Sequence, residues 1–227
     1  MTAERQPRYH SDKTLLKIRR RVVKLGGLVI DNLERAEEVV VDDRLELVSE
    51  VVDADKVIDK RYTKLDSLTF MAIAQQKPTD GDLRFLVSST RLLYELERSG
   101  DLVVNIANLA KRIKGLPDSP VLRDLLRRLF AESGRMLERA MDVFDKMDAV
   151  GGAQLDAEDD VVDDLVAEFY SAIKAEGIEL DSGIALNRMG RFLERIADHA
   201  VNVGTNTAYI VTGEFPRRTE VTGSENE

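Results

Sequence analysis

Apolar residues recur at intervals of three and four along most of this chain, which is the spacing of one face of an α-helix. Short segments containing Gly, Pro, Asp or Ser interrupt the pattern, and such segments end one helix and begin the next. The helices predicted in this way cover residues 11–40, 45–76, 81–113, 120–148, 154–176 and 181–211. The pattern therefore predicts an all-α fold of about six helices.

The breaks also indicate how the helices are grouped. Gly115 is typical of a helix end, and Ser119 followed by Pro120 is typical of the start of a new helix. We take this segment as the junction between two tandem, pseudo-symmetric three-helix bundles. The polar ends of the chain are expected to be disordered tails. The predicted order is a tail, two bundles and a second tail, over residues 1–9, 10–115, 116–213 and 214–227.

Two consecutive glycines, Gly26 and Gly27, lie inside the first predicted helix. A Gly in a helix interior costs about 1 kcal/mol relative to Ala. The pair therefore predicts either a kink or a close contact with another helix at this point.

The composition narrows the class of protein. Hydrophobic residues make up 43% of the 227 positions, enough for a sizeable core, and the absence of Cys excludes disulfides and thiolate-bound metals. The net charge of −9 argues against sequence-independent nucleic-acid binding and against a strongly basic membrane-facing surface. The amino-terminal segment lacks a signal-peptide core and no apolar stretch has membrane-spanning length, so we expect a soluble, cytoplasmic protein.

The strongest chemical signal is a pair of near-copies, residues 96–105 and 193–202, in which six of ten positions are identical. Each copy places a Glu, an Asp and an Asn four residues apart. Four residues advance about 40° beyond one full helical turn, so these three side chains form one polar stripe. The stripes are Glu97, Asp101 and Asn105 in the first copy, and Glu194, Asp198 and Asn202 in the second.

The middle helix of each half carries a further acidic pair at the same spacing, Asp55/Asp59 and Asp159/Asp163. In an antiparallel hairpin, two motifs lie at the same height when the turn falls halfway between them. The first two motifs are centred on positions 57 and 99, whose midpoint is 78, a Pro. The other two are centred on 161 and 196, whose midpoint falls in the second predicted turn. We therefore expect four carboxylates to face one another in each half.

Such a cluster of like charges needs a bound counter-charge or raised pKa values. Oxygen donors without thiols favour cations such as Mg, Mn, Ca or iron over structural zinc. We keep iron, manganese, magnesium and zinc as candidates. The metal ligands predicted are Asp55, Asp59, Glu97, Asp101, Asp159, Asp163, Glu194 and Asp198, with Asn105 and Asn202 as possible additional ligands.

An alternative reading leaves the clusters without metal. The chain has 42 acidic residues, so acidic pairs at spacing four also arise by chance. The predicted pairs could then form ion pairs on a partly exposed face. The available partners are Arg98, Arg195, Arg91 and Lys60.

No catalytic signature accompanies the acids. His199 follows Asp198 but is rotated about 100° from it, so we expect a surface or packing role beside the carboxylate stripe. No helix carries the Glu-x-x-His spacing of di-iron bundles. The chain also lacks a phosphate-cradling glycine loop, a nucleophile elbow and a kinase signature, so we expect no enzyme activity.

Several motifs in the same order resemble the PhoU family of phosphate-transport accessory and regulatory proteins. They are Asp82-Leu83-Arg84-Phe85 after the Pro78 turn, the two Leu-Glu-Arg-x-x-Asp-x-x-x-Asn copies, Asp198-His199, and Val211-Thr212-Gly213-Glu214. The resemblance covers roughly residues 9–214. The family's metal motifs map onto the four acidic pairs. Ser99-Gly100 and Ile196-Ala197 stand where the family usually has Ile-Gly, and they leave the acids intact.

The resemblance implies two tandem three-helix bundles and a regulator in place of a catalyst. Such proteins connect the ATPase subunit of the phosphate ABC transporter to a sensor histidine kinase. When phosphate is plentiful, such proteins thereby inhibit phosphate uptake and repress the phosphate-starvation response. The partners implied are these two proteins and a second copy of the chain in a homodimer. Contact with the membrane is expected only through the partners, and no nucleic acid is expected.

Two other classes of function remain open. A purely structural helical scaffold would bind no cation and would keep its partners without the carboxylates. A metal-dependent bundle enzyme would need an open coordination position beside a substrate pocket.

Overall fold

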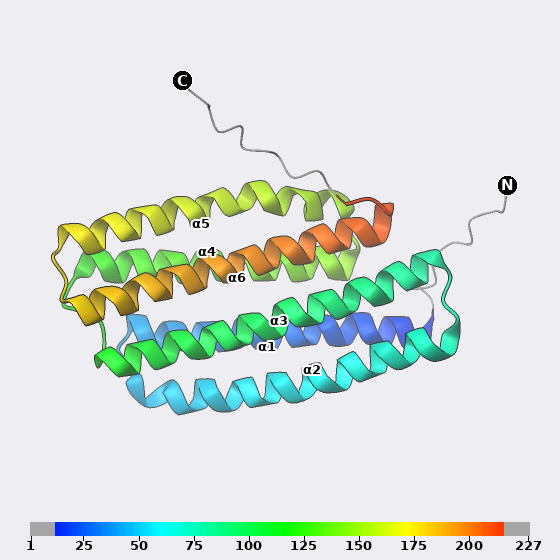
Figure 1. Cartoon of the computed structure of the whole chain (residues 1–227), viewed down its shortest axis with the longest axis horizontal. Coiled ribbons are helices and arrows are strands. Elements are labelled where there is room, and N and C mark those ends of the chain that lie inside the picture. The colour runs from blue at the N-terminus through cyan, green and yellow to red at the C-terminus, as the bar shows by residue number, and fades with distance from the viewer. Residues whose placement is uncertain (1–11, 216–227) are drawn as a thin grey trace, which may run out of the picture.

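The computed structural model describes residues 12–215, and helices account for nearly all of them (Figure 1). A single 3-10 turn, Leu45–Leu47, precedes the second helix, and the described residues contain no strand. The all-α prediction is confirmed. The helices are α1 (Lys13–Val41), α2 (Val48–Gln76), α3 (Asp80–Ile113), α4 (Pro120–Lys146), α5 (Ala149–Ala175) and α6 (Leu180–Thr212).

Side-chain oxygens cap the starts of α1 and α4, and the cap at Ser119 was predicted from the sequence. Asp12 accepts hydrogen bonds from the N–H groups of Thr14 and Leu15, and Ser119 accepts one from Leu122. Between α2 and α3, Lys77 has a left-handed backbone with φ of 44°, directly before Pro78. The turn therefore lies where the midpoint argument places it.

The fifth helix starts earlier than predicted, at Ala149 and not at 154. Asp148 caps it by accepting a hydrogen bond from the Gly151 N–H at 3.0 Å. Gly152 packs so closely on α6 that an added Cβ would stand 2.5 Å from the carbonyl oxygen of Gly204. The glycines at this position thus serve helix packing and do not form a loop.

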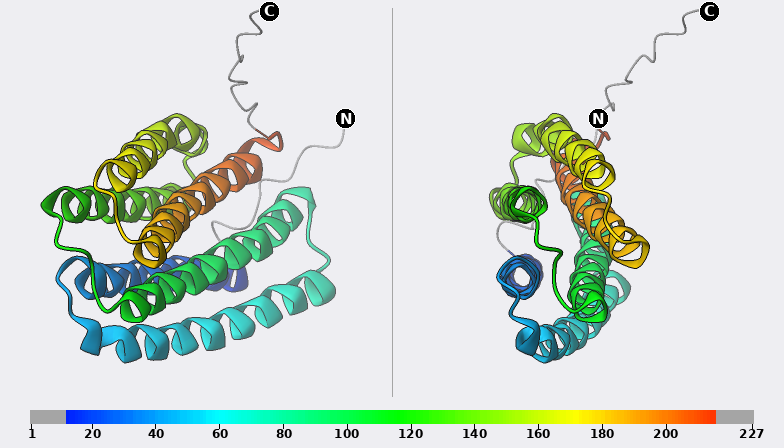
Figure 2. Two further views of the ribbon diagram at one scale, coloured as in Figure 1. Left: turned by 60° about the vertical axis from the view of Figure 1, so that its left-hand side comes forward. Right: turned by 90° about the vertical axis from the view of Figure 1, so that its left-hand side faces the viewer.

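The helices form two layers that run along the long axis of the molecule (Figures 1 and 2). The front layer contains α5, α6, α3 and α2 in that order, and α4 and α1 lie behind it. The halves α1–α3 and α4–α6 lie side by side, with α1 against α4 and α3 against α6. Helices α2 and α5 occupy the two edges.

The core continues from one half to the other without a break. Phe85 of α3 stacks on Phe144 of α4, with ring centroids 6.2 Å apart. Gly26 lies against α4, and a Cβ there would stand 2.1 Å from the Met141 sulfur. Helix α1 is continuous through this point, so the close-contact interpretation of the glycine pair is confirmed.

The boundary predicted between residues 115 and 116 falls in the connection between α3 and α4, and the division into two domains stays a prediction. The tail at 1–9 lies outside the described residues, as do residues 216–227 of the other tail. Phe215, which we assigned to that tail, stacks on Tyr209 with centroids 4.2 Å apart. No described helix is both long and apolar enough to cross a membrane.

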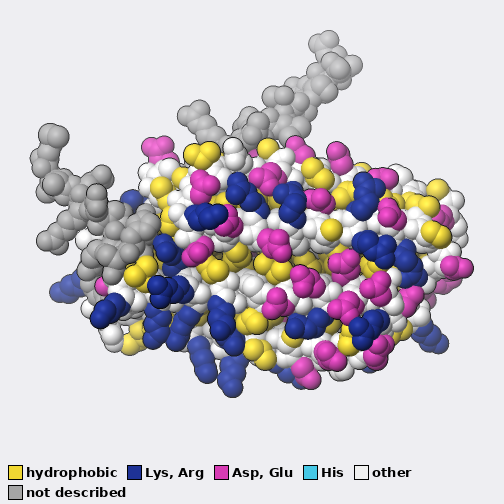
Figure 3. Space-filling view, turned by 180° about the vertical axis from the view of Figure 1, so that it is seen from behind, with side chains coloured by type: hydrophobic (Ala, Val, Ile, Leu, Met, Phe, Trp, Pro, Cys, Tyr) yellow, Lys and Arg dark blue, Asp and Glu magenta, His cyan; other side chains and the backbone are white. Residues whose placement is uncertain are grey.

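Charged side chains are unevenly distributed over the surface, which the net charge does not reveal. Figure 3 shows the molecule from behind, with Lys and Arg side chains gathered over the end where α1 begins. The net charge argued against a strongly basic membrane-facing surface, and Figure 3 limits that argument, because a net charge does not report how charges are spread over helix faces.

Candidate functional site

The first acidic cluster joins α2 and α3. Asp55 and Asp59 come from α2, and Glu97 and Asp101 from α3. Burial raises the pKa of Asp55 to about 6, and the negative charges of Asp59, Asp101 and Glu97 contribute to the rise. The pKa of Glu97 is raised as well, by burial and then by Asp101. The structure therefore brings the four predicted residues together.

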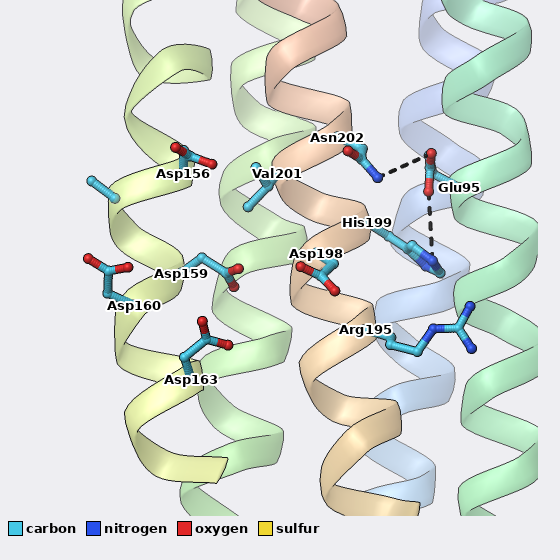
Figure 4. A pocket seen from close by; sticks show the side chains of 11 residues that line it. Glu95, Asp156, Asp159, Asp160, Asp163, Arg195, Asp198, His199, Val201 and Asn202 are labelled. Carbon is cyan, nitrogen blue, oxygen red and sulfur yellow. Dashed lines mark hydrogen bonds and ion pairs between the residues drawn. The ribbon is translucent and has the colours of Figure 1, made fainter. Parts of the chain in front are cut away.

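The second cluster joins α5 and α6 in the same way. Burial raises the pKa of Asp159 to about 7, together with the charges of Asp198, Asp163 and Glu194. In Figure 4, Asp159 points from α5 toward α6, and Asp198 points back from α6. The midpoint argument thus holds in both halves.

Each cluster contains one buried carboxylate oxygen with no hydrogen-bond partner among the described residues. These atoms are Oδ1 of Asp55 and Oδ1 of Asp159, which are buried and occupy equivalent places in the two halves. An unsatisfied buried oxygen is costly, and such groups are rare in folded proteins. The two halves therefore share one feature, a buried carboxylate oxygen that no described residue bonds.

Ion pairs account for only part of the acidic charge. Arg98 lies 3.4 Å from Asp101 in the first half, and in the second Glu194 is paired with Arg191, which the sequence analysis had not considered. Arg91, one of the partners considered, lies over the ring of Phe215. The two ion pairs involve exposed Arg side chains, and such pairs contribute little stability.

The donor atoms of both clusters are oxygens, which hard cations prefer as ligands. All eight predicted side chains carry carboxylate oxygens, the preferred ligands of Mg, Mn and Ca. As the side chains stand, no three His, Asp or Glu residues of the described chain lie close enough together to hold one ion. Binding would therefore require the carboxylates to turn inward, toward the unsatisfied oxygens of Asp55 and Asp159.

A cavity of 690 Å³ opens beside the second cluster (Figure 4). Asp159, Asp163 and Asp198 line one part of it. The remaining lining residues include Glu95 of α3, so this cavity reaches across to the other half of the molecule. The second cluster thus has open space beside it.

His199 connects the two halves at this cavity. Its side chain is buried, and Nδ1 lies 2.9 Å from Ser99 Oγ of α3 while Nε2 lies 3.7 Å from Glu95 Oε2. Burial lowers the pKa of His199 to about 4, and the positive charges of Arg195 and Arg98 add to this effect. A buried, neutral His is consistent with the expected packing role, although its hydrogen bond to the other half was not foreseen.

Glu95 is the residue that sequence reasoning missed. It accepts a hydrogen bond from the Asn202 amide at 3.3 Å, and burial raises its pKa. The near-copies begin one residue later, and the position equivalent to Glu95 in the second copy is Phe192. The comparison of the copies therefore held no signal for Glu95.

The two predicted Asn ligands occupy different surroundings. Asn202 lines the cavity of the second cluster. Asn105 is exposed and lines a separate hollow of 200 Å³ with Arg112 and Arg188. Only Asn202 therefore lies at the edge of the cavity that the second cluster lines.

Comparison with known proteins gives a consistent result. The family model described as the PhoU domain matches residues 22–110 and again residues 126–207. A Mycobacterium leprae protein named phosphate-specific transport system accessory protein PhoU homolog 1 is 30% identical, over 95% of this chain and 98% of its own. A homolog with the same description from Synechocystis is 26% identical, over 91% of this chain and 93% of its own.

Solved structures share the fold. The crystal structure of PhoU from Pseudomonas aeruginosa has a TM-score of 0.83 and 24% identity, covering 91% of this chain and all of that one. The phosphate transport system regulatory protein PhoU from Streptococcus pneumoniae has a TM-score of 0.80 and 21% identity, covering 88% and 96%. Two matches to one family domain, with relatives aligned over nearly their whole length, place this chain in the PhoU family.

Proposed function

We propose that this chain is a negative regulator of phosphate uptake and of the phosphate-starvation response. In this proposal it is a metal-binding adaptor between the ATPase subunit of a phosphate ABC transporter and a sensor histidine kinase. It acts in the cytoplasm, at the membrane through these partners, and as a homodimer. The names of the relatives support the link to phosphate transport, since they describe accessory proteins of a phosphate-specific transport system.

The observation that carries the proposal is the pair of unsatisfied oxygens, Asp55 Oδ1 and Asp159 Oδ1, at equivalent places in two carboxylate clusters. A bound cation would supply positive charge to each cluster. The carboxylates of α2 and α3 would then be drawn together, as would those of α5 and α6. Because these four helices form the front layer, the ions would fix the surface that they present to partners.

The adaptor reading is favoured over an enzyme by the hydrogen bonds at the Ser99–His199 pair. Ser99 Oγ lies 2.8 Å from the backbone carbonyl oxygen of Glu95 and 2.9 Å from His199 Nδ1, so its hydroxyl is engaged within the chain. His199 Nε2 lies 3.7 Å from Glu95 Oε2, so both ring nitrogens are also held by contacts within the chain. Ser99 is also fully buried, away from any substrate.

A structural scaffold is the second candidate, and the two ion pairs at Asp101 and Glu194 favour it. In a scaffold these carboxylates would serve only to solubilise the front face. Replacing them would leave the interaction with partners unchanged.

The regulatory role is tested by deleting the gene and measuring starvation-gene expression at high phosphate. We expect the genes to become active, and to be silenced again by the wild-type chain. A variant with Glu97→Ala and Asp101→Ala should fail to silence them. The matched control, Glu138→Ala with Asp142→Ala, removes an acidic pair of the same spacing from α4, outside both clusters, and should silence them.

Each contrary result has a distinct meaning. If the genes stay silent in the deletion strain, the regulatory role is wrong. If the cluster variant silences them as well as the control does, the carboxylates are not needed and the scaffold reading is correct.

A further inference from the structure

One face of α1 carries five positively charged side chains within its first four turns. Lys13, Lys17, Arg20, Arg21 and Lys24 are all exposed. At 100° per residue they fall within about a 100° sector of the helix, opposite the buried stripe that includes Ile18 and Val22. Four of them surround a shallow hollow of 330 Å³ on the surface. We call this group the α1 basic surface.

The α1 basic surface has no acidic partners within the described chain. None of its five side chains forms an ion pair with another residue of 12–215. Elsewhere the Arg residues are commonly paired, as in Arg135 with Glu132 and Glu158, or Arg123 with Asp43. Among the residues that the structure describes, no acidic neighbour compensates the positive charge of this face.

Helix α2 extends the charge beside α1. Lys60, Arg61 and Lys64 are exposed and unpaired among the described residues, and α2 runs antiparallel to α1 along the same edge of the molecule. Figure 3 shows the Lys and Arg side chains gathered over this end of α1 and the neighbouring part of the surface. The positive region thus spans two helices.

We propose that the α1 basic surface binds the anionic phospholipid headgroups of a bilayer directly. Clusters of Lys and Arg on one face of a helix attract anionic membranes, because each exposed cation gains from the negative potential of the leaflet. This contact goes beyond the proposed function, in which the chain reaches the membrane only through protein partners. It needs neither metal nor a partner.

The composition of the surface favours lipid over an acidic protein partner. Interfaces between proteins are depleted in Lys and centred on apolar or aromatic anchors. Three of the five side chains here are Lys, and the hollow that they surround contains only one apolar residue, the half-buried Leu16. The side chains are long, unpaired cations on a convex helix. They can contact an anionic membrane surface without the shape complementarity that a protein partner requires.

The placement of the surface also suits a protein that must keep its other face free. Helix α1 lies in the back layer, while both carboxylate clusters are formed by helices of the front layer. An anionic bilayer attracts the positive charges of the α1 basic surface and repels the negative charges of the carboxylate clusters. Docking through α1 would therefore orient the molecule with the clusters turned away from lipid.

Vesicle flotation tests the proposal with the full-length chain. Vesicles of phosphatidylglycerol in phosphatidylcholine should carry the protein at low salt, and pure phosphatidylcholine vesicles should not. A chelator is present throughout, so that divalent ions cannot bridge the acidic clusters to lipid. Added salt should release the protein, because screening weakens contacts between exposed charges.

The decisive variant combines Lys17→Glu, Arg20→Glu, Arg21→Glu and Lys24→Glu. We expect its vesicle affinity to fall by roughly tenfold or more. The control makes the same change of charge at exposed positions near the far ends of α3, α5 and α6. It combines Lys111→Glu, Arg112→Glu, Lys174→Glu and Arg188→Glu, and should lose clearly less. If the first variant misfolds by circular dichroism, the same four positions are changed to Gln.

Three results would overturn the proposal. They are no binding to anionic vesicles, an equal loss in the two variants, and capture by polyglutamate but not by vesicles, which would indicate an acidic protein partner. The metal content of the basic-surface variant should equal that of wild type. A failure of vesicle binding would therefore not contradict the proposed regulatory function. An absence of metal binding would not contradict the proposed contact with lipid.

Discussion

Ser99 on α3 and His199 on α6 are hydrogen bonded across the two halves, with 2.9 Å between Ser99 Oγ and His199 Nδ1. Ser99 Oγ also lies within hydrogen-bond distance, 2.8 Å, of the backbone carbonyl oxygen of Glu95, one turn earlier on α3. Glu95 in turn accepts a hydrogen bond from Asn202 of α6. A buried polar chain therefore joins the halves directly beside the second carboxylate cluster.

Replacing Ser99 with Ala should destabilise the protein. The change leaves the buried Nδ1 of His199 without its hydrogen-bond partner, which costs about 1–3 kcal/mol. Urea unfolding of the two proteins measures the difference. As a control, Ser171→Ala removes an exposed hydroxyl from α5 and should change stability by less than about 0.5 kcal/mol. Equal stability of Ser99→Ala and wild type would show that the hydrogen bond does not hold the halves together.

The pH dependence of stability should reveal the clusters in metal-free protein. The pKa of Asp159 is raised in the folded state to about 7. A carboxyl with a raised folded pKa costs stability once it is forced to ionise, so this penalty is absent below the unfolded value of about 4 and grows as the pH rises to about 7. In the presence of chelator, the contribution of Asp159 to stability should therefore be lower at about pH 8 than at about pH 5, opposite to that of His199, whose lowered pKa makes stability rise over the same range.

The variant Asp159→Asn removes this penalty. At about pH 8 it should stabilise the metal-free protein by on the order of 1 kcal/mol, a figure reduced for the partial exposure of the side chain. Asp160→Asn, on an exposed position of the same helix, is the matched control and should gain less. If Asp159→Asn is no more stable than Asp160→Asn, ionisation of Asp159 does not destabilise the folded protein.

Gly152→Ala should destabilise the protein strongly. The added Cβ would meet the backbone carbonyl oxygen of Gly204 at 2.5 Å, and backbone cannot move aside as a side chain can. Overpacking of this kind costs about 1–3 kcal/mol. The control is Gly27→Ala, where nothing lies within 4 Å and the change should stabilise by about 0.5–1 kcal/mol. Similar unfolding midpoints for the two variants would contradict the close contact of α5 and α6.

The elements and the pairing of acids could be predicted from sequence because both follow from local rules. Helical periodicity fixed the six helices, and the Pro78 turn fixed the height at which Asp55 faces Glu97. The start of α5 could not be predicted. The glycines at that point predict a loop. Their role in packing becomes clear only from the contact between Gly152 and Gly204, some 50 residues later.

The remaining features depend on tertiary contacts and were missed for that reason. Glu95 joins the site from the neighbouring half, and its counterpart Phe192 carries no charge to suggest it. The α1 basic surface was overlooked because a net charge of −9 averages over all faces. Helical spacing alone places its five cations on one side, and the packed helices show that this side is exposed.

The central claim is that the carboxylate clusters bind metal and thereby stiffen the helix hairpins. Elemental analysis of gently purified protein, combined with melting before and after chelation, tests it most directly. The variant with Glu97, Asp101, Glu194 and Asp198 all changed to Ala is compared with wild type. We predict that wild type contains metal and melts at a lower temperature after chelation, while the variant contains none and is insensitive to chelator. Equal metal content and equal chelator response in the two proteins would contradict the account.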